Sequence, residues 1–203
     1  MQSTIRTASR LVRSGVPIVL LAIGARTAPG QLPERGFFVG YETLEMAMNE
    51  FKNFAGEVGF RLSPKHQLRL TIMEVDLTER HLASKWESFA VDGPNVVGYF
   101  QGYEAHVDRF FKRSWYVSGA VGFYKDSYRH TQLDQSLENK TFTLGSGIGY
   151  TRSNLLGIKG LYVNVDVPVR YYFNPIKETK WGETTIMPHV VVNNLWVFAG
   201  FKL

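Results

Sequence analysis

The sequence has no cysteine among its 203 residues and no apolar run long enough to cross a membrane as a helix. The absence of cysteine excludes a disulfide scaffold, a thiolate metal site and a cysteine nucleophile, although it leaves the redox compartment open. A spanning helix needs roughly 18 or more consecutive apolar residues, and no window comes near that length. Any membrane integration therefore has to use strands.

Large apolar side chains, by contrast, are abundant. The chain contains 14 Phe, 10 Tyr and 4 Trp, and 44% of its residues are hydrophobic. Burying so many large side chains offsets the entropy lost on ordering, so the composition excludes a disordered chain. The length suits one folded domain.

The N-terminal segment differs from the rest. Arg6, Arg10 and Arg13 precede an apolar stretch over 16–23 that ends in the small residues Gly24 and Ala25. This layout predicts a cleaved export signal over 1–25, followed by a short linker over 26–35; a mitochondrial-type presequence or a disordered tail are the alternatives. Removing the three arginines lowers the formal net charge from +5 to +2, so the basic charge gives little support to nucleic-acid binding.

From residue 36 onward, apolar side chains recur every second residue rather than every 3.6, and the alternation appears eight times. The segment 161–173 has apolar residues at every odd position, and the last segment alternates as far as Leu203. We therefore predict an all-β domain over 36–203 made of eight strands.

The connections between these strands alternate in length. Short turns fall at 63–66, 111–114 and 153–157, and longer polar loops at 45–53, 79–94, 125–139 and 174–188. Turns at one rim and loops at the other, with an even number of strands, are typical of an eight-stranded antiparallel up-and-down transmembrane β-barrel.

One face of each strand is nearly free of charge, whereas the other carries acids, arginines and glycines. A soluble lipocalin-like barrel would point its aliphatic face inward, and a membrane barrel does the reverse. An acid-rich face interleaved with glycine favours a narrow, hydrogen-bonded interior. The third strand changes phase after Ile72, which predicts a β-bulge there. The expected interior charge network consists of Glu57, Arg61, Arg69, Glu74, Asp76, Glu104, His106, Asp108, Asp166 and Arg170.

On this architecture, residues 36–203 resemble the small eight-stranded outer-membrane proteins of the OmpA/OmpX type. The C-terminal strand 195–203 carries part of the resemblance. In that family the last residue is most often Phe and is read by the machinery that inserts barrels; here Phe201 and Leu203 occupy the matching strand end. The resemblance implies the bacterial outer membrane as location, with the insertion machinery, outer-membrane lipids and lipopolysaccharide as partners.

The interior charges allow two interpretations. They could form an ion or proton path, or they could pair with one another and plug a barrel that is only wide enough for its own side chains. The pattern favours the plug. His106 lies between Glu104 and Asp108 on the inward face, but no Ser or Cys nucleophile shares that face of the strand, so we interpret it as a structural histidine.

Two further functions remain open at the level of sequence. A barrel enzyme that modifies lipid A would need a histidine near a serine at the rim. The candidate pairs are His81 with Ser84 or Ser88, and His130 with Ser127 or Ser136. Alternatively, loop aromatics could bind a surface partner or pack over the barrel mouth; these are Phe51, Trp86, Phe89, Tyr128 and Trp181.

The sequence thus predicts a monomeric, non-enzymatic outer-membrane barrel that serves envelope structure or surface interaction through its loops. It predicts no catalytic residue, no cofactor and no metal site, since the five histidines lack metal-ligand spacing. The alternatives are the lipid A enzyme and the soluble carrier.

Overall fold

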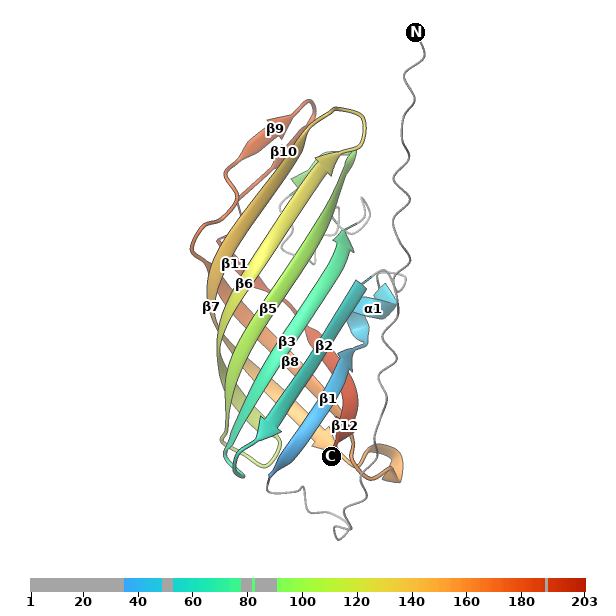
Figure 1. Ribbon diagram of the computed structural model, residues 1–203, viewed down its shortest axis with the longest axis vertical. Coiled ribbons are helices and arrows are strands. Elements are labelled where there is room, and N and C mark those ends of the chain that lie inside the picture. Colours follow the sequence, from blue (N-terminus) through green and yellow to red (C-terminus); the bar gives the residue numbers. More distant parts are fainter. Residues whose placement is uncertain (1–34, 49–52, 78–81, 83–90, 189) are drawn as a thin grey trace.

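The computed structural model describes residues 35–48, 53–77, 82, 91–188 and 190–203, and most of them form a closed antiparallel β-barrel (Figure 1). Its eight strands are β1 (Gly36–Glu42), β2 (Asn53–Arg61), β3 (His66–Leu77), β5 (Val96–Phe110), β6 (Trp115–His130), β7 (Ser136–Ser153), β8 (Leu161–Tyr172) and β12 (Trp196–Lys202). Each pairs with its neighbour in the chain, and β12 pairs with β1 to close the ring. The expected fold class is therefore confirmed. The predicted export signal lies outside the described residues.

The closing seam between β1 and β12 is held by a carboxylate as well as by the strand ladder. Glu42 points inward at the end of β1, and its Oε1 accepts hydrogen bonds from the backbone N–H of Leu44 (3.1 Å) and of Val197 (3.0 Å). Leu44 begins the short helix α1 (Leu44–Met48). One side chain therefore ties the first strand to both the following turn and the last strand.

The last strand is interrupted opposite a proline. β11 (Val191–Asn193) and β12 pair with β8 in the same register, and Asn194 between them faces Pro168. Proline has no N–H to donate to the ladder, so regular pairing stops there and resumes beyond it. The chain from residue 191 to 202 is thus one strand with a gap.

Short turns and long connections lie at opposite ends of the barrel, as predicted; we call these the turn end and the loop end (Figure 1). The turn end includes the 3₁₀ turn η1 (Leu155–Gly157). At the loop end, β4 (Val91–Asp92), β9 (Thr179–Trp181) and β10 (Thr184–Ile186) form a small additional sheet. The loop predicted over 125–139 is wrong in length, because β6 and β7 stay paired as far as Arg129 and Ser136.

The predicted bulge in β3 is also wrong. β3 pairs without a break with β2 from Gln67 to Val75 and with β5 from His66 to Leu77. The phase change comes instead from the interior, which turns from polar to apolar toward the loop end. Met73, Val75 and Leu77 continue the inward positions of Arg69 and Thr71 and are buried among aromatic side chains.

Inside the barrel, aromatic rings lie over glycines of the adjacent strand. Tyr116 on β6 faces Gly149 on β7, and Tyr124 on β6 faces Gly102 on β5. A Cβ atom added at either glycine would collide with the ring. On the outer face the opposite holds, because a Cβ at Gly119 would meet nothing within 4 Å.

A glycine under a buried ring and a glycine on the open outer face should respond differently to substitution by alanine. Gly149→Ala should destabilise the barrel by about 1–3 kcal/mol, because the methyl group forces the buried Tyr116 ring off its position. Gly119→Ala, the matched control on the neighbouring strand, should change stability by less than about 0.5 kcal/mol. Urea unfolding of the refolded proteins measures both, and equal effects would contradict the assigned faces.

Candidate functional site

The centre of the interior is organised by one arginine. Arg69 on β3 reaches three carboxylates on three other strands: Nη1 lies 3.3 Å from Glu57, Nε 3.3 Å from Asp108 and Nη2 2.7 Å from Asp166. All four side chains are fully buried. Buried charges are tolerated only when they are paired and hydrogen-bonded, and this cluster of four residues meets that requirement through the guanidinium.

Neutral side chains donate further hydrogen bonds to Glu57 and Asp108, whereas Oδ1 of Asp166 is buried without a hydrogen-bond partner among the described residues. The hydroxyl of Tyr162 donates to Glu57 Oε1 (2.7 Å), and the amide of Asn164 donates to Glu57 Oε2 (3.3 Å). Gln67 donates to Asp108 (3.0 Å), and the hydroxyl of Tyr116 donates to the amide oxygen of Asn164 (2.8 Å). The network therefore links β2, β3, β5, β6 and β8 across the lumen.

A second charged cluster lies next to the first, toward the loop end. The guanidinium of Arg170 pairs with Glu104 through Nε and through Nη2 (2.8 Å), and it lies 4.1 Å from the centre of the Trp196 ring. His106 connects the clusters, with Nε2 3.2 Å from Glu104 and Nδ1 3.4 Å from Arg69. The two ring nitrogens of His106 thus contact one charged group of each cluster.

Thr71, His106 and Glu104 are close enough to suggest a catalytic triad, but the geometry is wrong for one. The Thr71 hydroxyl and the Glu104 carboxylate both contact the same ring nitrogen, Nε2, at 3.4 Å and 3.2 Å. A nucleophile and an orienting acid must bind opposite ring nitrogens for the imidazole to accept a proton from one while held by the other. His106 is thus a connecting residue of the network.

The expected network residues therefore have three different positions. Glu57, Arg69, Asp108 and Asp166 form the first cluster, and Glu104, His106 and Arg170 form the second. Arg61 lies inside at the turn end, where its Nη2 donates to the carbonyl of Pro64 (2.7 Å) and its guanidinium packs on the Phe110 ring.

Glu74 and Asp76 are corrections to that expectation. They alternate with the buried Met73, Val75 and Leu77 and so face outward. Glu74 accepts a hydrogen bond from Gln101, another outward residue (2.9 Å). Because the bulge is absent, these two acids are not part of the interior.

The loop end of the interior is closed by apolar side chains. Residues of the loop-end connections pack with residues of the barrel wall in one buried cluster, which contains Val75, Leu77, Leu82, Val96, Tyr128, Ile176, Trp181 and Ile186. Tyr128 and Trp181 are 2% and 5% exposed, so these two aromatics pack over the barrel mouth and offer no surface to a partner. Phe51, Trp86 and Phe89 lie outside the described residues.

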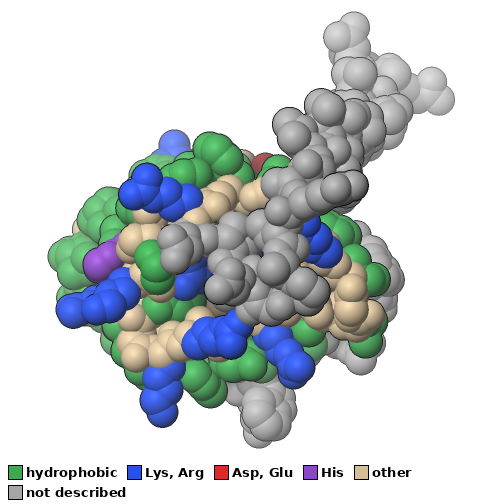
Figure 2. All heavy atoms as spheres, turned by 90° about the horizontal axis from the view of Figure 1, so that it is seen from below, with side chains coloured by type: hydrophobic (Ala, Val, Ile, Leu, Met, Phe, Trp, Pro, Cys, Tyr) green, Lys and Arg blue, Asp and Glu red, His purple; other side chains and the backbone are tan. Residues whose placement is uncertain are grey.

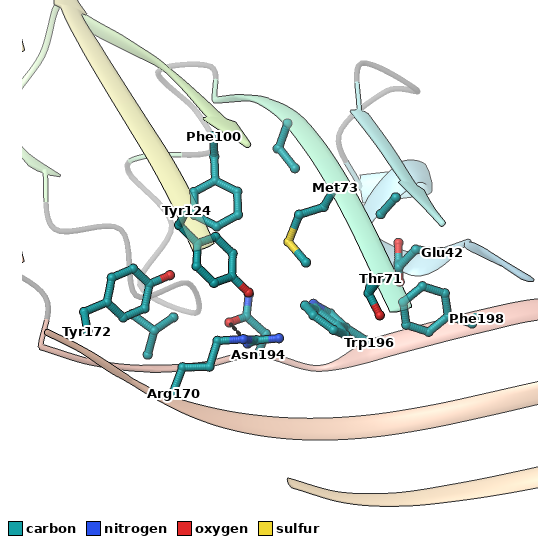
Figure 3. A pocket seen from close by; sticks show the side chains of 13 residues that line it. Glu42, Thr71, Met73, Phe100, Tyr124, Arg170, Tyr172, Asn194, Trp196 and Phe198 are labelled. Atoms are coloured by element: carbon teal, nitrogen blue, oxygen red, sulfur yellow. Dashed lines mark hydrogen bonds between the residues drawn. The ribbon is translucent and has the colours of Figure 1, made fainter. Parts of the chain in front are cut away.

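Between this apolar cap and the second charged cluster lies a small cavity (Figure 3). Tyr124, Tyr172 and Trp196 line it together with Arg170, which donates to Asn194. Its volume is about 40 Å³. A water molecule needs about 10–15 Å³ on this measure, whereas cavities that bind benzene have about 150 Å³, so the cavity suits a few waters and not an organic ligand.

The outer face of the barrel is apolar over a continuous band, which we call the apolar belt. Its exposed aliphatic members include Val58, Leu68, Leu70, Ile72, Val107, Val117, Val121, Leu144, Ile148, Val167 and Val169. On β7 the outward residues from Phe142 to Tyr150 carry no charge over nine residues, and Lys140 and Arg152 bound them. On β6 the matching segment runs from Trp115 to Phe123, also nine residues.

At the loop end, the edge of the apolar belt can be located from outward residues that pair side by side across neighbouring strands. We call each such set a row. The last apolar row contains Ile72, Tyr103, Phe123, Phe142 and Phe173. The next row contains Glu74, Gln101, Lys125 and Lys140. Beyond the belt, Lys125 lies 2.8 Å from Glu138 and holds the pKa of that exposed carboxyl below its usual range.

The rim histidines do not form the enzyme pairs considered above. His130 points inward and its Nδ1 accepts from the backbone N–H of Gln132 (3.2 Å) and Leu133 (3.0 Å), whereas Ser127 and Ser136 lie on the outer face. His81, Ser84 and Ser88 lie outside the described residues. Within the described ranges, no group of three or more His, Asp or Glu residues is arranged to hold a metal ion.

No helix in the part of the chain that the structure describes has the length and apolarity to span a membrane.

Comparison with known proteins adds one architectural match. The crystal structure of the N-terminal β-barrel domain of Pseudomonas aeruginosa OprF aligns over 83% of this chain and 94% of that chain, with 12% sequence identity and a TM-score of 0.40. No protein-family model matches the sequence, and no curated protein is significantly similar to it. The class of fold rests on the strand order and register: this is a closed eight-stranded antiparallel barrel with sequential strands.

The central cluster yields a stability prediction. Arg69→Leu should destabilise the barrel by about 3–5 kcal/mol, because three buried carboxylates lose the cation they share. The control Lys125→Leu removes a cation from an exposed pair and should cost less than about 1 kcal/mol. Urea titration of both variants gives the comparison; an Arg69→Leu barrel as stable as the control would mean that the network does not hold the lumen together.

Proposed function

We propose that this protein is a non-enzymatic β-barrel of the bacterial outer membrane, with its apolar belt in the lipid and its interior closed by its own side chains. It would serve envelope structure or surface interaction through the loop end. The proposal includes export by the N-terminal segment 1–25, insertion by the machinery that reads strand ends such as Phe201 and Leu203, and a monomeric state. In the structure Phe201 faces outward and Leu203 is 51% exposed at the turn end.

The main observation behind this proposal is that charged residues lie inside the barrel and apolar residues outside, the reverse of a water-soluble barrel. Ionised residues gather in the lumen, whereas the outward faces of β6 and β7 are free of charge over nine residues each. At about 3.3 Å per residue and a tilt near 40°, nine residues rise about 23 Å, close to the roughly 25 Å apolar band of outer-membrane barrels. A water-soluble barrel would expose this band to water at a large cost.

Aromatic side chains at both edges of the apolar belt also support its location in a membrane. Near the turn end, Phe37 packs on Phe60 (4.6 Å between ring centres) and Trp115 on Tyr150 (5.1 Å). At the loop end, the row that contains Tyr103, Phe123 and Phe142 ends the belt. Aromatic girdles of this kind lie at the two interfaces of a membrane barrel.

The soluble carrier is less well supported, because a carrier needs an internal cavity for its ligand. In the described interior, the two charged clusters and the aromatic residues around them occupy the lumen, and the cavity beside Arg170 has a volume of only about 40 Å³. For the lipid A enzyme, the candidate His130 points inward, away from Ser127 and Ser136 on the outer face.

The lipid-facing role of the apolar belt can be tested by placing a charge at its middle. Val121→Arg should destabilise the barrel in lipid vesicles by about 2–4 kcal/mol, because the charge enters the hydrocarbon region. Ser127→Arg places the same residue on the same face of β6 beyond the belt, so its cost should be about 0–1 kcal/mol. In a water-soluble barrel the first substitution would be harmless.

The compartment is tested by fractionation of the expressed full-length protein, followed by electrophoresis with and without boiling. We expect recovery in the outer-membrane fraction and a band that shifts on boiling, because the barrel stays folded in detergent until it is heated. Recovery as a soluble periplasmic species that folds without detergent would overturn the proposal.

The closed interior makes a separate prediction about transport. Planar bilayers containing the refolded protein should show no steady conductance, because charged pairs fill the middle of the lumen and apolar side chains close the loop end. Channel openings in the wild-type protein, at a rate comparable to a porin control, would show that the network opens.

A further inference from the structure

The turn end carries a ring of exposed cations and no exposed acid among the described residues. Figure 2 shows Lys and Arg side chains spaced around this end of the barrel. The exposed members are Arg35, Lys65, Arg109, Lys112, Arg113, Arg152 and Lys159. We call these seven residues the basic rim. Two acids are adjacent to it in sequence: Asp108 is buried and paired with Arg69, and Glu34 lies outside the described residues.

The loop end differs, because cations and acids are mixed there. Lys125 pairs with Glu138, and Glu74, Asp92 and Asp134 are also near that end. The one-sided distribution means that the basic rim attracts anions at one end of the barrel only. Mixed charges would keep a protein in solution equally well. We therefore interpret the gathering of cations at the turn end as a surface that binds an anionic partner.

The position of the basic rim relative to the apolar belt narrows the choice of partner. Arg152 follows Tyr150 on the outer face of β7, and Tyr150 packs on Trp115. The N–H of Thr151 bonds to the carbonyl of Ser114 (2.9 Å), which holds Arg152 beside the turn that carries Lys112 and Arg113. Three cations therefore lie next to an aromatic pair at the edge of the belt, at the height of lipid headgroups.

The η1 turn adds an apolar component. Leu156 is 93% exposed and Ile158 is 49% exposed, and both precede Lys159. In Figure 1 this turn, drawn in orange, extends sideways from the lower end of the barrel. Apolar side chains beside a cation suit a lipid interface, where the side chains contact acyl chains and the cation contacts phosphate. A soluble anion would gain nothing from the exposed leucine.

We propose that the basic rim binds the headgroups of anionic phospholipids in the membrane leaflet that meets the turn end, with Lys112, Arg113 and Arg152 forming one such site beside Trp115. This inference rests on the proposed membrane location and deepens it, since it assigns a lipid class to one end of the barrel. The interaction also sets the barrel's height in the leaflet, because the cations are held at the phosphates while the belt stays in hydrocarbon.

Trp115 provides a probe, because it is 43% exposed at this site whereas Trp181 and Trp196 are each 5% exposed. The full chain is refolded into phosphatidylcholine vesicles containing either brominated phosphatidylglycerol or brominated phosphatidylcholine at equal fractions. Bromine quenches tryptophan on contact, so the ratio of the two quenching values reports the local lipid preference. A Trp115→Phe variant gives the background from the other tryptophans, which is subtracted.

We expect brominated phosphatidylglycerol to quench Trp115 several-fold more effectively than brominated phosphatidylcholine. The triple variant Lys112→Gln, Arg113→Gln, Arg152→Gln should lose this preference, since each cation near the surface contributes roughly fivefold. The matched control Lys125→Gln, Arg129→Gln, Lys140→Gln removes the same charge at the loop end and should keep it. Raising the salt concentration to about 0.5 M should reduce the wild-type preference by screening, a readout independent of whether the variants fold.

The outcomes separate the inference from the proposal beneath it. Equal quenching by both lipids, unaffected by salt, would overturn the headgroup site while leaving the membrane barrel intact, and would point to a soluble or macromolecular anion as the partner of the basic rim. Absence of quenching by either lipid would contradict the membrane location itself. If the preference for phosphatidylglycerol persists in the turn-end triple variant but is lost in the loop-end triple variant, the lipid site is at the loop end and the inference is wrong.

Discussion

The guanidinium of Arg69 pairs with fully buried carboxylates from three other strands, and the polar centre of the barrel is organised around that arrangement. Isolated buried carboxylates would be too costly to desolvate, so the cation is what allows an acid-rich lumen to exist. Because the partners come from β2, β5 and β8, the same contacts also fix the distances across the barrel. Tyr162 donates to the oxygen of Glu57 that the arginine does not reach, and Asn164 and Gln67 donate second hydrogen bonds to oxygens that it does reach.

A filled polar interior and an apolar exterior are two aspects of one constraint. Each strand alternates its side chains between the two faces, so concentrating charge inside leaves aliphatic and aromatic residues outside. In the described interior, charged pairs and aromatic side chains occupy the centre of the lumen, and this is the basis for the proposal that interactions take place at the surface. That surface has three parts: the loop end with mixed charges, the apolar belt, and the basic rim. The boundaries between them lie where charged residues first appear on the outward face of each strand.

Most of the barrel could be predicted from residue alternation, because a period of two identifies strands without any knowledge of their partners. The prediction from alternation was wrong where the barrel interior changes from polar to apolar along a strand. Glu74 and Asp76 were expected inside because apolar residues on β3 changed phase, yet the strand continues without a bulge and the interior itself becomes apolar. Likewise, the polar segment 125–139 read as a loop, although most of it belongs to strands that extend beyond the belt.

The sequence by itself determined the strand number, the alternation of turns and loops, and the inward face of most strands, since these follow from local periodicity. It could not determine which charges meet. Arg69 and Asp166 are 97 residues apart and become partners only because the closed ring brings β3 and β8 across the same lumen. The basic rim also appears only in the tertiary structure, because its cations come from separate turns that ring closure brings to one end.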